Sequence, residues 1–210
     1  MSLVPVAKDR SFGPELVLEC RQAMSLASGD INGNGFTDLV IACRESYKNG
    51  ECSWIYWGGN DGYSEARRTR IDSFRACDVT VCDFDGDGYS DIVICQCHTY
   101  ESFTRDALLY RGNPEGVADK AIHFETQDAR RVFPVCSPNE PNPNLFFVNH
   151  YSRKIFQVSP VIYYGSPDGP SADRCDYVPG FGAVEAVCAD VNDDGLIDLC
   201  LLYTSDAADE

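Results

Sequence analysis

The sequence is poor in basic residues and has no long hydrophobic run. Lys and Arg total 17 against 33 Asp and Glu, which gives a formal net charge of −16. Such a chain repels nucleic acid backbones and anionic membrane surfaces, so we expect no nucleic acid partner. No stretch reaches the ~20 apolar residues of a transmembrane helix, and the first twenty residues lack a signal peptide's apolar core. Neither membrane insertion nor export is predicted from this segment.

No CxxC pair occurs among the eleven cysteines. The closest two, Cys95 and Cys97, are too tightly spaced for a usual zinc site. Several cysteines stand in apolar runs, as Cys43 does at the end of LVIAC, where a free thiol behaves as a small hydrophobe. We expect buried thiols in preference to the alternative, a disulfide framework, which is more typical of short chains.

The last eleven residues need separate treatment. Their sequence, CLLYTSDAADE at 200–210, resembles the translated read-through of a common sequencing adapter. We therefore leave them out of the predicted fold and take 1–199 as the domain. On this interpretation the natural chain continues beyond Leu199, in the middle of a repeat.

An acidic motif recurs three times in the chain. It reads GDINGNGFTDLVIA at 29–42, CDFDGDGYSDIVIC at 82–95 and ADVNDDGLIDLCLL at 189–202. Its first aspartates, Asp30, Asp83 and Asp190, lie 53 and 107 residues apart, so a further copy is expected near 137–145. That region has no aspartate and carries three prolines, which marks it as a degenerate copy.

A glycine turn repeats with the same period. It reads YWGGNDG, YRGNPEG and YYGSPDG, and its closing glycines Gly62, Gly116 and Gly169 are 54 and 53 residues apart. Each unit of about fifty residues contains four short apolar or β-rich runs, the signature of a propeller blade. The predicted fold is all-β: a partial β-propeller with three four-stranded blades and the start of a fourth. The segment PELVLE at 14–19 fits a last strand from a preceding blade.

The acidic loops at 30–38, 83–91 and 190–198 have the residue types of calcium sites. Alternating carboxylates and amides on a tight glycine-containing loop bring several oxygens to one point, and Ca²⁺ prefers six to eight oxygen ligands. Up to three ions are predicted. The candidate ligands, with one backbone carbonyl per loop at Phe36, Tyr89 or Leu196, are Asp30, Asn32, Asn34, Phe36 and Asp38; Asp83, Asp85, Asp87, Tyr89 and Asp91; and Asp190, Asn192, Asp194, Leu196 and Asp198.

Two other interpretations of these loops compete with calcium binding. An EF-hand needs a bidentate Glu at loop position twelve, where this chain has Ile41, Ile94 and Leu201. Polar turns without metal are common for a single loop but less expected for three copies in register, each with Asp at position nine. Counting carboxylates, we expect the Asp83 loop to bind most tightly, the Asp190 loop less and the Asp30 loop least.

These motifs together resemble the FG-GAP or VCBS repeat family, the calcium-binding propeller blades also found in integrin α subunits. The resemblance rests on the three acidic loops, the glycine turns and the Phe181-Gly182-Ala183 segment. It implies a propeller of usually seven blades, a mainly structural metal on one face, and an extracellular or cell-surface location. The prolines of the degenerate loop depart from the family pattern.

The opposite face is the candidate place for a ligand, because long connections there carry Tyr47, Tyr100 and Tyr151 and the histidines His98 and His150. An exposed tyrosine can stack on a sugar or anchor a protein, although packing against the next blade is the favoured role. No nucleophile or acidic partner stands beside either histidine in sequence. We expect a non-catalytic module for protein or carbohydrate ligands; the alternative is part of a propeller-type polysaccharide lyase or glycoside hydrolase.

Overall fold

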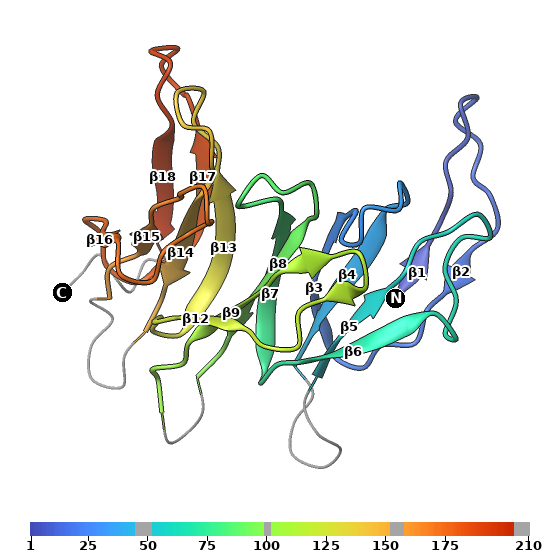
Figure 1. Ribbon diagram of the computed structural model, residues 1–210. Coiled ribbons are helices and arrows are strands. Elements are labelled where there is room, and N and C mark those ends of the chain that lie inside the picture. The colour runs from blue at the N-terminus through green and yellow to red at the C-terminus, as the bar shows by residue number, and fades with distance from the viewer. Residues whose placement is uncertain (45–51, 99–101, 152–157, 204–210) are drawn as a thin grey trace.

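The computed structural model describes residues 1–44, 52–98, 102–151 and 158–203, and the regular elements within these ranges are all β-strands (Figure 1). These ranges contain no helix long and apolar enough to span a membrane. Three antiparallel sheets of four strands stand side by side, followed by a two-stranded sheet. The predicted all-β fold is confirmed, and the sheets are consistent with propeller-like blades.

Each four-stranded sheet is a meander in which successive strands are hydrogen-bonded neighbours. The first sheet contains β3 (Ala23–Gly29), β4 (Asp38–Cys43), β5 (Cys52–Tyr56) and β6 (Arg68–Asp72). The second contains β7 (Ala76–Cys82), β8 (Asp91–Gln96), β9 (Ala107–Tyr110) and β12 (Ile122–Phe124). The third contains β13 (Ala129–Val135), β14 (Asn144–Asn149), β15 (Val161–Tyr163) and β16 (Cys175–Tyr177).

Three two-stranded sheets accompany the four-stranded ones in the described ranges. The strands β17 (Ala183–Ala189) and β18 (Asp198–Tyr203) pair with each other, so the first four residues of the 200–210 tail lie in a strand. In the second sheet's glycine turn, β10 (Gly112–Asn113) and β11 (Gly116–Val117) form a small hairpin. At the N-terminus β1 (Ser2–Leu3) pairs with β2 (Leu16–Val17), so PELVLE supplies a short strand of a two-stranded sheet.

The hydrophobic core lies between the sheets and not inside any one of them. The second strands β4, β8 and β14 are buried along their whole length, because each is covered on both faces. This explains why they read as continuous apolar runs, whereas a half-exposed strand would alternate. One cluster joins the first and second sheets through Ile55 and Ile94, and another joins the second and third through Leu109 and Phe147.

Neighbouring sheets meet along their first strands, since β7 contacts both β3 and β13, and β13 contacts β17. In Figure 1 the loops that follow these first strands rise on one side of the sheets. Contacts between consecutive loops agree with this, because Ser90 N donates to Asp30 O at 3.0 Å and Asn142 Nδ2 to Phe84 O at 3.4 Å. The fold therefore gathers the acidic loops on one face.

Candidate metal centre

The first aspartate of each acidic loop accepts hydrogen bonds from the backbone of its own loop. Asp83 accepts from Gly86 N at 2.7 Å and Gly88 N at 3.0 Å. Asp30 and Asp190 each accept from the backbone N–H groups four and five residues later. These bonds close the loop around the carboxylate, and the glycine at position six has a φ between +82° and +92° in all three loops. Glycine adopts that conformation without strain.

Positions three and five of the loops follow a second repeated pattern. In the second loop Asp85 Oδ1 accepts from Asp87 N at 3.3 Å, and Asp87 Oδ1 accepts from Tyr89 N at 2.9 Å. Each of these bonds uses one carboxylate oxygen and leaves the other free of backbone bonds. The same bonds recur in the other two loops, where the acceptors are Asn32 and Asn34, and Asn192 and Asp194.

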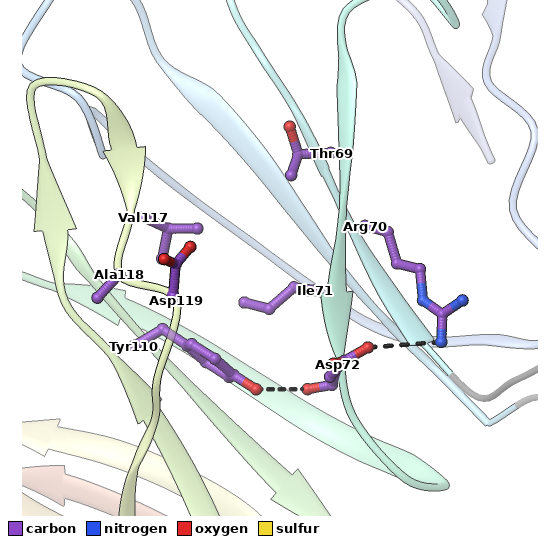
Figure 2. A pocket seen from close by; sticks show the side chains of 8 residues that line it. All are labelled: Thr69, Arg70, Ile71, Asp72, Tyr110, Val117, Ala118 and Asp119. Atoms are coloured by element: carbon purple, nitrogen blue, oxygen red, sulfur yellow. Dashed lines mark hydrogen bonds and ion pairs between the residues drawn. The ribbon is translucent and has the colours of Figure 1, made fainter.

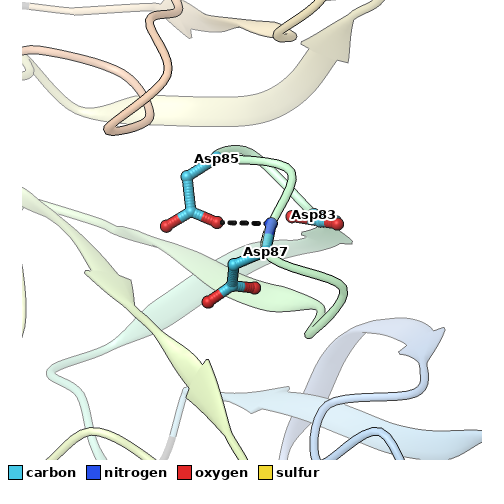
Figure 3. Close-up of side chains that lie close together, drawn as sticks. All are labelled: Asp83, Asp85 and Asp87. Atoms are coloured by element: carbon cyan, nitrogen blue, oxygen red, sulfur yellow. Dashed lines mark hydrogen bonds between the residues drawn. The ribbon is translucent and has the colours of Figure 1, made fainter.

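Three carboxylates of the second loop converge. One oxygen each from Asp83, Asp85 and Asp87 lies within 4.8 Å of the other two (Figure 3). Within the described residues this is the one group of three or more acidic, histidine or cysteine donors so placed. Its donors are all oxygens, which suits a hard cation such as Ca²⁺ and not a soft one. The residues present therefore fit the metal that the loop pattern predicts.

The aspartate at position nine has a different environment. Asp38 and Asp91 are fully buried. Asp91 accepts from Phe84 N at 3.2 Å and from Gly112 N at 3.0 Å. Burial raises its pKa to about 6, although Arg111 and these backbone donors oppose the shift. Asp91 lies outside the converging group, so its role as a ligand stays a prediction, as do those of Asp38 and Asp198.

In the three four-stranded sheets the position-nine residue also joins its loop to the glycine turn that follows. Asp38 accepts from Gly58 N at 2.8 Å, as Asp91 does from Gly112 N. In the third sheet Asn144 Oδ1 accepts from Gly165 N at 2.8 Å, so an amide makes the same link there. The glycine is needed because an added Cβ would lie 2.3 to 2.5 Å from the carbonyl oxygen of the residue at loop position eight.

The degenerate loop of the third sheet keeps the link but has no aspartate. Its one carboxylate, Glu140 at position five, accepts from Asn144 Nδ2 at 2.6 Å. Strand register pairs Val135 with Asn144, as Cys82 pairs with Asp91, which sets the equivalent loop at 136–144. Cys136 then stands in place of the first aspartate and Pro138 in place of the third-position ligand. A cavity of about 300 Å³ lies beside this loop, lined by Glu140, Pro141, Asn142, Asn144, Tyr164, Gly165, Ser166, Pro167 and Arg174.

Arg111 is the residue near the metal centre that sequence reasoning missed. Its Nη1 lies 3.1 Å from Asp85 Oδ2 and 2.6 Å from Asp91 Oδ2. A sequence signal existed, because Arg111 is the middle residue of the Tyr-x-Gly turn, where the other copies have Trp57 and Tyr164. Nothing in the spacing of that turn places its side chain against the preceding loop.

The opposite face holds a cluster around His98. Its Nδ1 lies 2.7 Å from Asp128 Oδ1, and Asp128 is fully buried and also accepts from Arg130 Nη2 at 2.8 Å. The ring of His98 stacks on Phe103, which meets Tyr151 edge to face at 5.1 Å. The structure thus supplies an acidic partner that the sequence did not place. Tyr47 and Tyr100 lie outside the described residues.

A second cavity, of about 240 Å³, separates the outer strand of the first sheet from the glycine turn of the second (Figure 2). Tyr110 Oη donates to Asp72 O at 2.8 Å, and Arg70 Nη2 lies 3.4 Å from Asp72 Oδ1. Thr69, Val117 and Asp119 line the rest. The polar groups of this cleft are mostly paired with each other.

Comparison with known proteins supports the repeat assignment. A search of curated proteins finds no match to the chain. The family model described as FG-GAP-like repeat matches residues 30–94, which contain the first two acidic loops and the whole of the first sheet after β3. This confirms the resemblance over that segment. Residues 30–94 of this chain are therefore similar to FG-GAP-like repeats.

Proposed function

We propose that this chain is a calcium-stabilised, propeller-type binding module. The observation that carries the proposal is the convergence of Asp83, Asp85 and Asp87 in a loop of an FG-GAP-like repeat. The first and last acidic loops repeat its backbone hydrogen bonds and are proposed as weaker calcium sites. The three sheets and the β17–β18 pair correspond to three blades and the opening of a fourth, in a natural propeller of seven.

Calcium would act here on stability. A cation that binds the folded loops and not the unfolded chain raises the melting temperature as its concentration rises. The first two acidic loops lie next to one another, since Ser90 N donates to Asp30 O, so ions there would neutralise part of the −16 formal charge where the first two sheets meet. The ligand of the module is proposed to be a protein or a carbohydrate, bound without catalysis.

The test uses the metal-stripped chain and follows thermal unfolding during a calcium titration. The matched variant is Asp85→Asn/Asp87→Asn, because Asn32 and Asn34 already accept the equivalent backbone hydrogen bonds in the first loop. We expect calcium to raise the melting temperature of the wild type, and the variant, whose second loop then has the ligand types of the weaker first loop, to lose part of that rise. A folded wild type without any calcium response would refute the proposal.

The enzyme alternative is weaker. His98 and Asp128 form an acid–base pair, but Asp128 is fully buried, whereas a glycoside hydrolase uses two carboxylates that flank the substrate. His98 follows β8, and Asp128 stands immediately before β13 in the next sheet. Their contact therefore joins the two sheets. The test is to screen the wild type and His98→Ala against polysaccharide substrates. Cleavage of one of them by the wild type but not by the variant would support the enzyme alternative.

A further inference from the structure

Arg111 places a positive charge inside the second acidic loop. Its Nη1 contacts Asp85, one of the three converging carboxylates, at 3.1 Å and the buried Asp91 at 2.6 Å. The guanidinium side chain is only 19% exposed, and Asp85 17%. A bond so shielded from water is weakened less by salt than a surface ion pair.

The same guanidinium also belongs to the next sheet. Arg111 Nη2 donates to Asp168 O, in the glycine turn of the third sheet, at 2.6 Å. The neighbouring Gly169 has φ +84°, and a Cβ there would overlap the guanidinium. One side chain therefore spans the second acidic loop and the third sheet, and the turn is shaped to receive it.

Asp85 is therefore paired with Arg111 and is also a proposed calcium ligand. Calcium bound by Asp83, Asp85 and Asp87 would draw on the carboxylate that Arg111 already holds, and its charge would repel the guanidinium at short range. The four carboxylates of this loop carry −4, and Arg111 reduces that to −3, equal to the three carboxylates predicted as ligands in the last loop. Counting carboxylates alone therefore overstates the calcium affinity of the second loop.

We propose that Arg111 is a built-in competitor of calcium at the second loop, which lowers calcium affinity there and ties calcium loading to the contact between the second and third sheets. The inference rests on the proposed calcium function. In the metal-free chain Arg111 supplies the positive charge and holds the two sheets together. On loading, calcium takes over Asp85, and Arg111 keeps Asp91 and the Asp168 carbonyl.

Isothermal titration of the full chain with calcium tests this, with Arg111→Gln as the neutral variant and Arg111→Lys as the charge-preserving control. Each protein is compared with its own Asp85→Ala/Asp87→Ala counterpart, which removes two of the three converging carboxylates, so that the difference reports the second loop. We expect Arg111→Gln to bind calcium there ~10-fold more tightly, and Arg111→Lys to stay close to wild type. The metal-free melting temperature of Arg111→Gln should fall, while its calcium-induced rise should grow.

The outcomes separate this inference from the proposed function. Equal or weaker calcium binding by Arg111→Gln, with calcium binding still reduced in the double variant, would overturn the competitor role and leave the calcium module standing. Tightening by Arg111→Lys as well would also overturn it, because the charge would not be the cause. Folded chains that never respond to calcium would defeat both. Arg111→Met, which keeps the aliphatic stem, replaces Arg111→Gln if the latter does not fold.

Discussion

Ser25 Oγ donates a 2.6 Å hydrogen bond to Asp78 Oδ1, and the two residues occupy the same position in consecutive first strands. Each follows a register shift at the start of its strand, as do Arg131 and Glu185 in β13 and β17. Asp78 Oδ2 accepts from Val132 N at 2.9 Å, and Arg131 Nε lies 2.7 Å from Glu185 Oε2. Polar contacts from one repeated position thus join the first sheet to the second, the second to the third, and the third to the β17–β18 pair.

The charge of Asp78 should cost stability at neutral pH. Burial raises its pKa, and the bonds from Ser25 and Val132 oppose the shift without cancelling it. A folded-state pKa above the ordinary value of about 3.9 means that folding favours the protonated form, so stability falls as pH rises above that value. We expect Asp78→Asn, measured by urea unfolding in chelator, to gain stability relative to wild type as pH increases from 4 to 7.

The amide suits this position, because its oxygen can accept from Val132 N while its nitrogen donates to Ser25 Oγ. Ser25→Ala is the control, since it removes a bond to Asp78 without removing the charge. A difference between Asp78→Asn and wild type that stays constant with pH would show that ionisation of Asp78 does not drive the effect.

A left-handed residue stands immediately before three of the first strands. Gln22, Arg75 and Asp128 have φ values of 46° to 47°, and Gly182, the glycine of the Phe-Gly-Ala segment, has φ 62°. A left-handed φ costs a non-glycine residue about 1–2 kcal/mol. Replacement by glycine removes this cost, but part of the gain is lost because glycine has a greater conformational entropy in the unfolded chain. We expect exposed Gln22→Gly to stabilise the chain by about 0.5–1 kcal/mol in urea unfolding. Gly182→Ala should act in the opposite direction, and equal signs would contradict the strain account.

The Tyr-x-Gly turns should not tolerate a side chain at glycine. A Cβ on Gly112 would lie 2.4 Å from Ser90 O and 2.6 Å from Ile31 O, both backbone atoms. Gly112→Ala should cost roughly 1–3 kcal/mol or more, because backbone must move. Gly62→Ala has open space around it and φ +74°, so it should cost only about 1 kcal/mol. Chemical denaturation of both variants compares the two, and equal losses would remove the clash explanation.

The sequence predicted the repeat, the strands and the loops because those depend on local patterns. Asp83, Asp85 and Asp87 lie within five residues, and one tight turn suffices to bring them together. Arg111 and Asp128 were missed because their partners belong to other strands or sheets, and a repeat period does not say which side chain crosses between them. The short β1–β2 sheet at the N-terminus was missed for the same reason, since Ser2 pairs with Val17 and Leu3 with Leu16, across a connection that carries no repeat signal.

Counting aspartates also could not separate a carboxylate that faces a metal from one that binds backbone. Position nine was predicted as a ligand from its residue type alone. The structure gives Asp38 two backbone donors, Ile31 N at 3.0 Å and Gly58 N at 2.8 Å, and no exposed surface. Asp87, at position five, is exposed and accepts one backbone bond.

These environments predict opposite results for the same chemical change. Asp38→Asn replaces one acceptor oxygen with an NH2 group, which then faces a backbone N–H, so that two donors meet. A buried unsatisfied group of this kind costs about 1–3 kcal/mol of folding stability even without metal. Asp87→Asn should change metal-free stability by less than about 0.5 kcal/mol, as exposed substitutions usually do, since Asn34 makes the equivalent bond at 2.8 Å. Calcium-dependent stabilisation should fall in Asp87→Asn. Urea unfolding in chelator and in calcium measures both quantities. If Asp38→Asn kept wild-type stability in chelator and lost only its calcium response, the main role of position nine would be to bind metal and not to link the loop to the glycine turn.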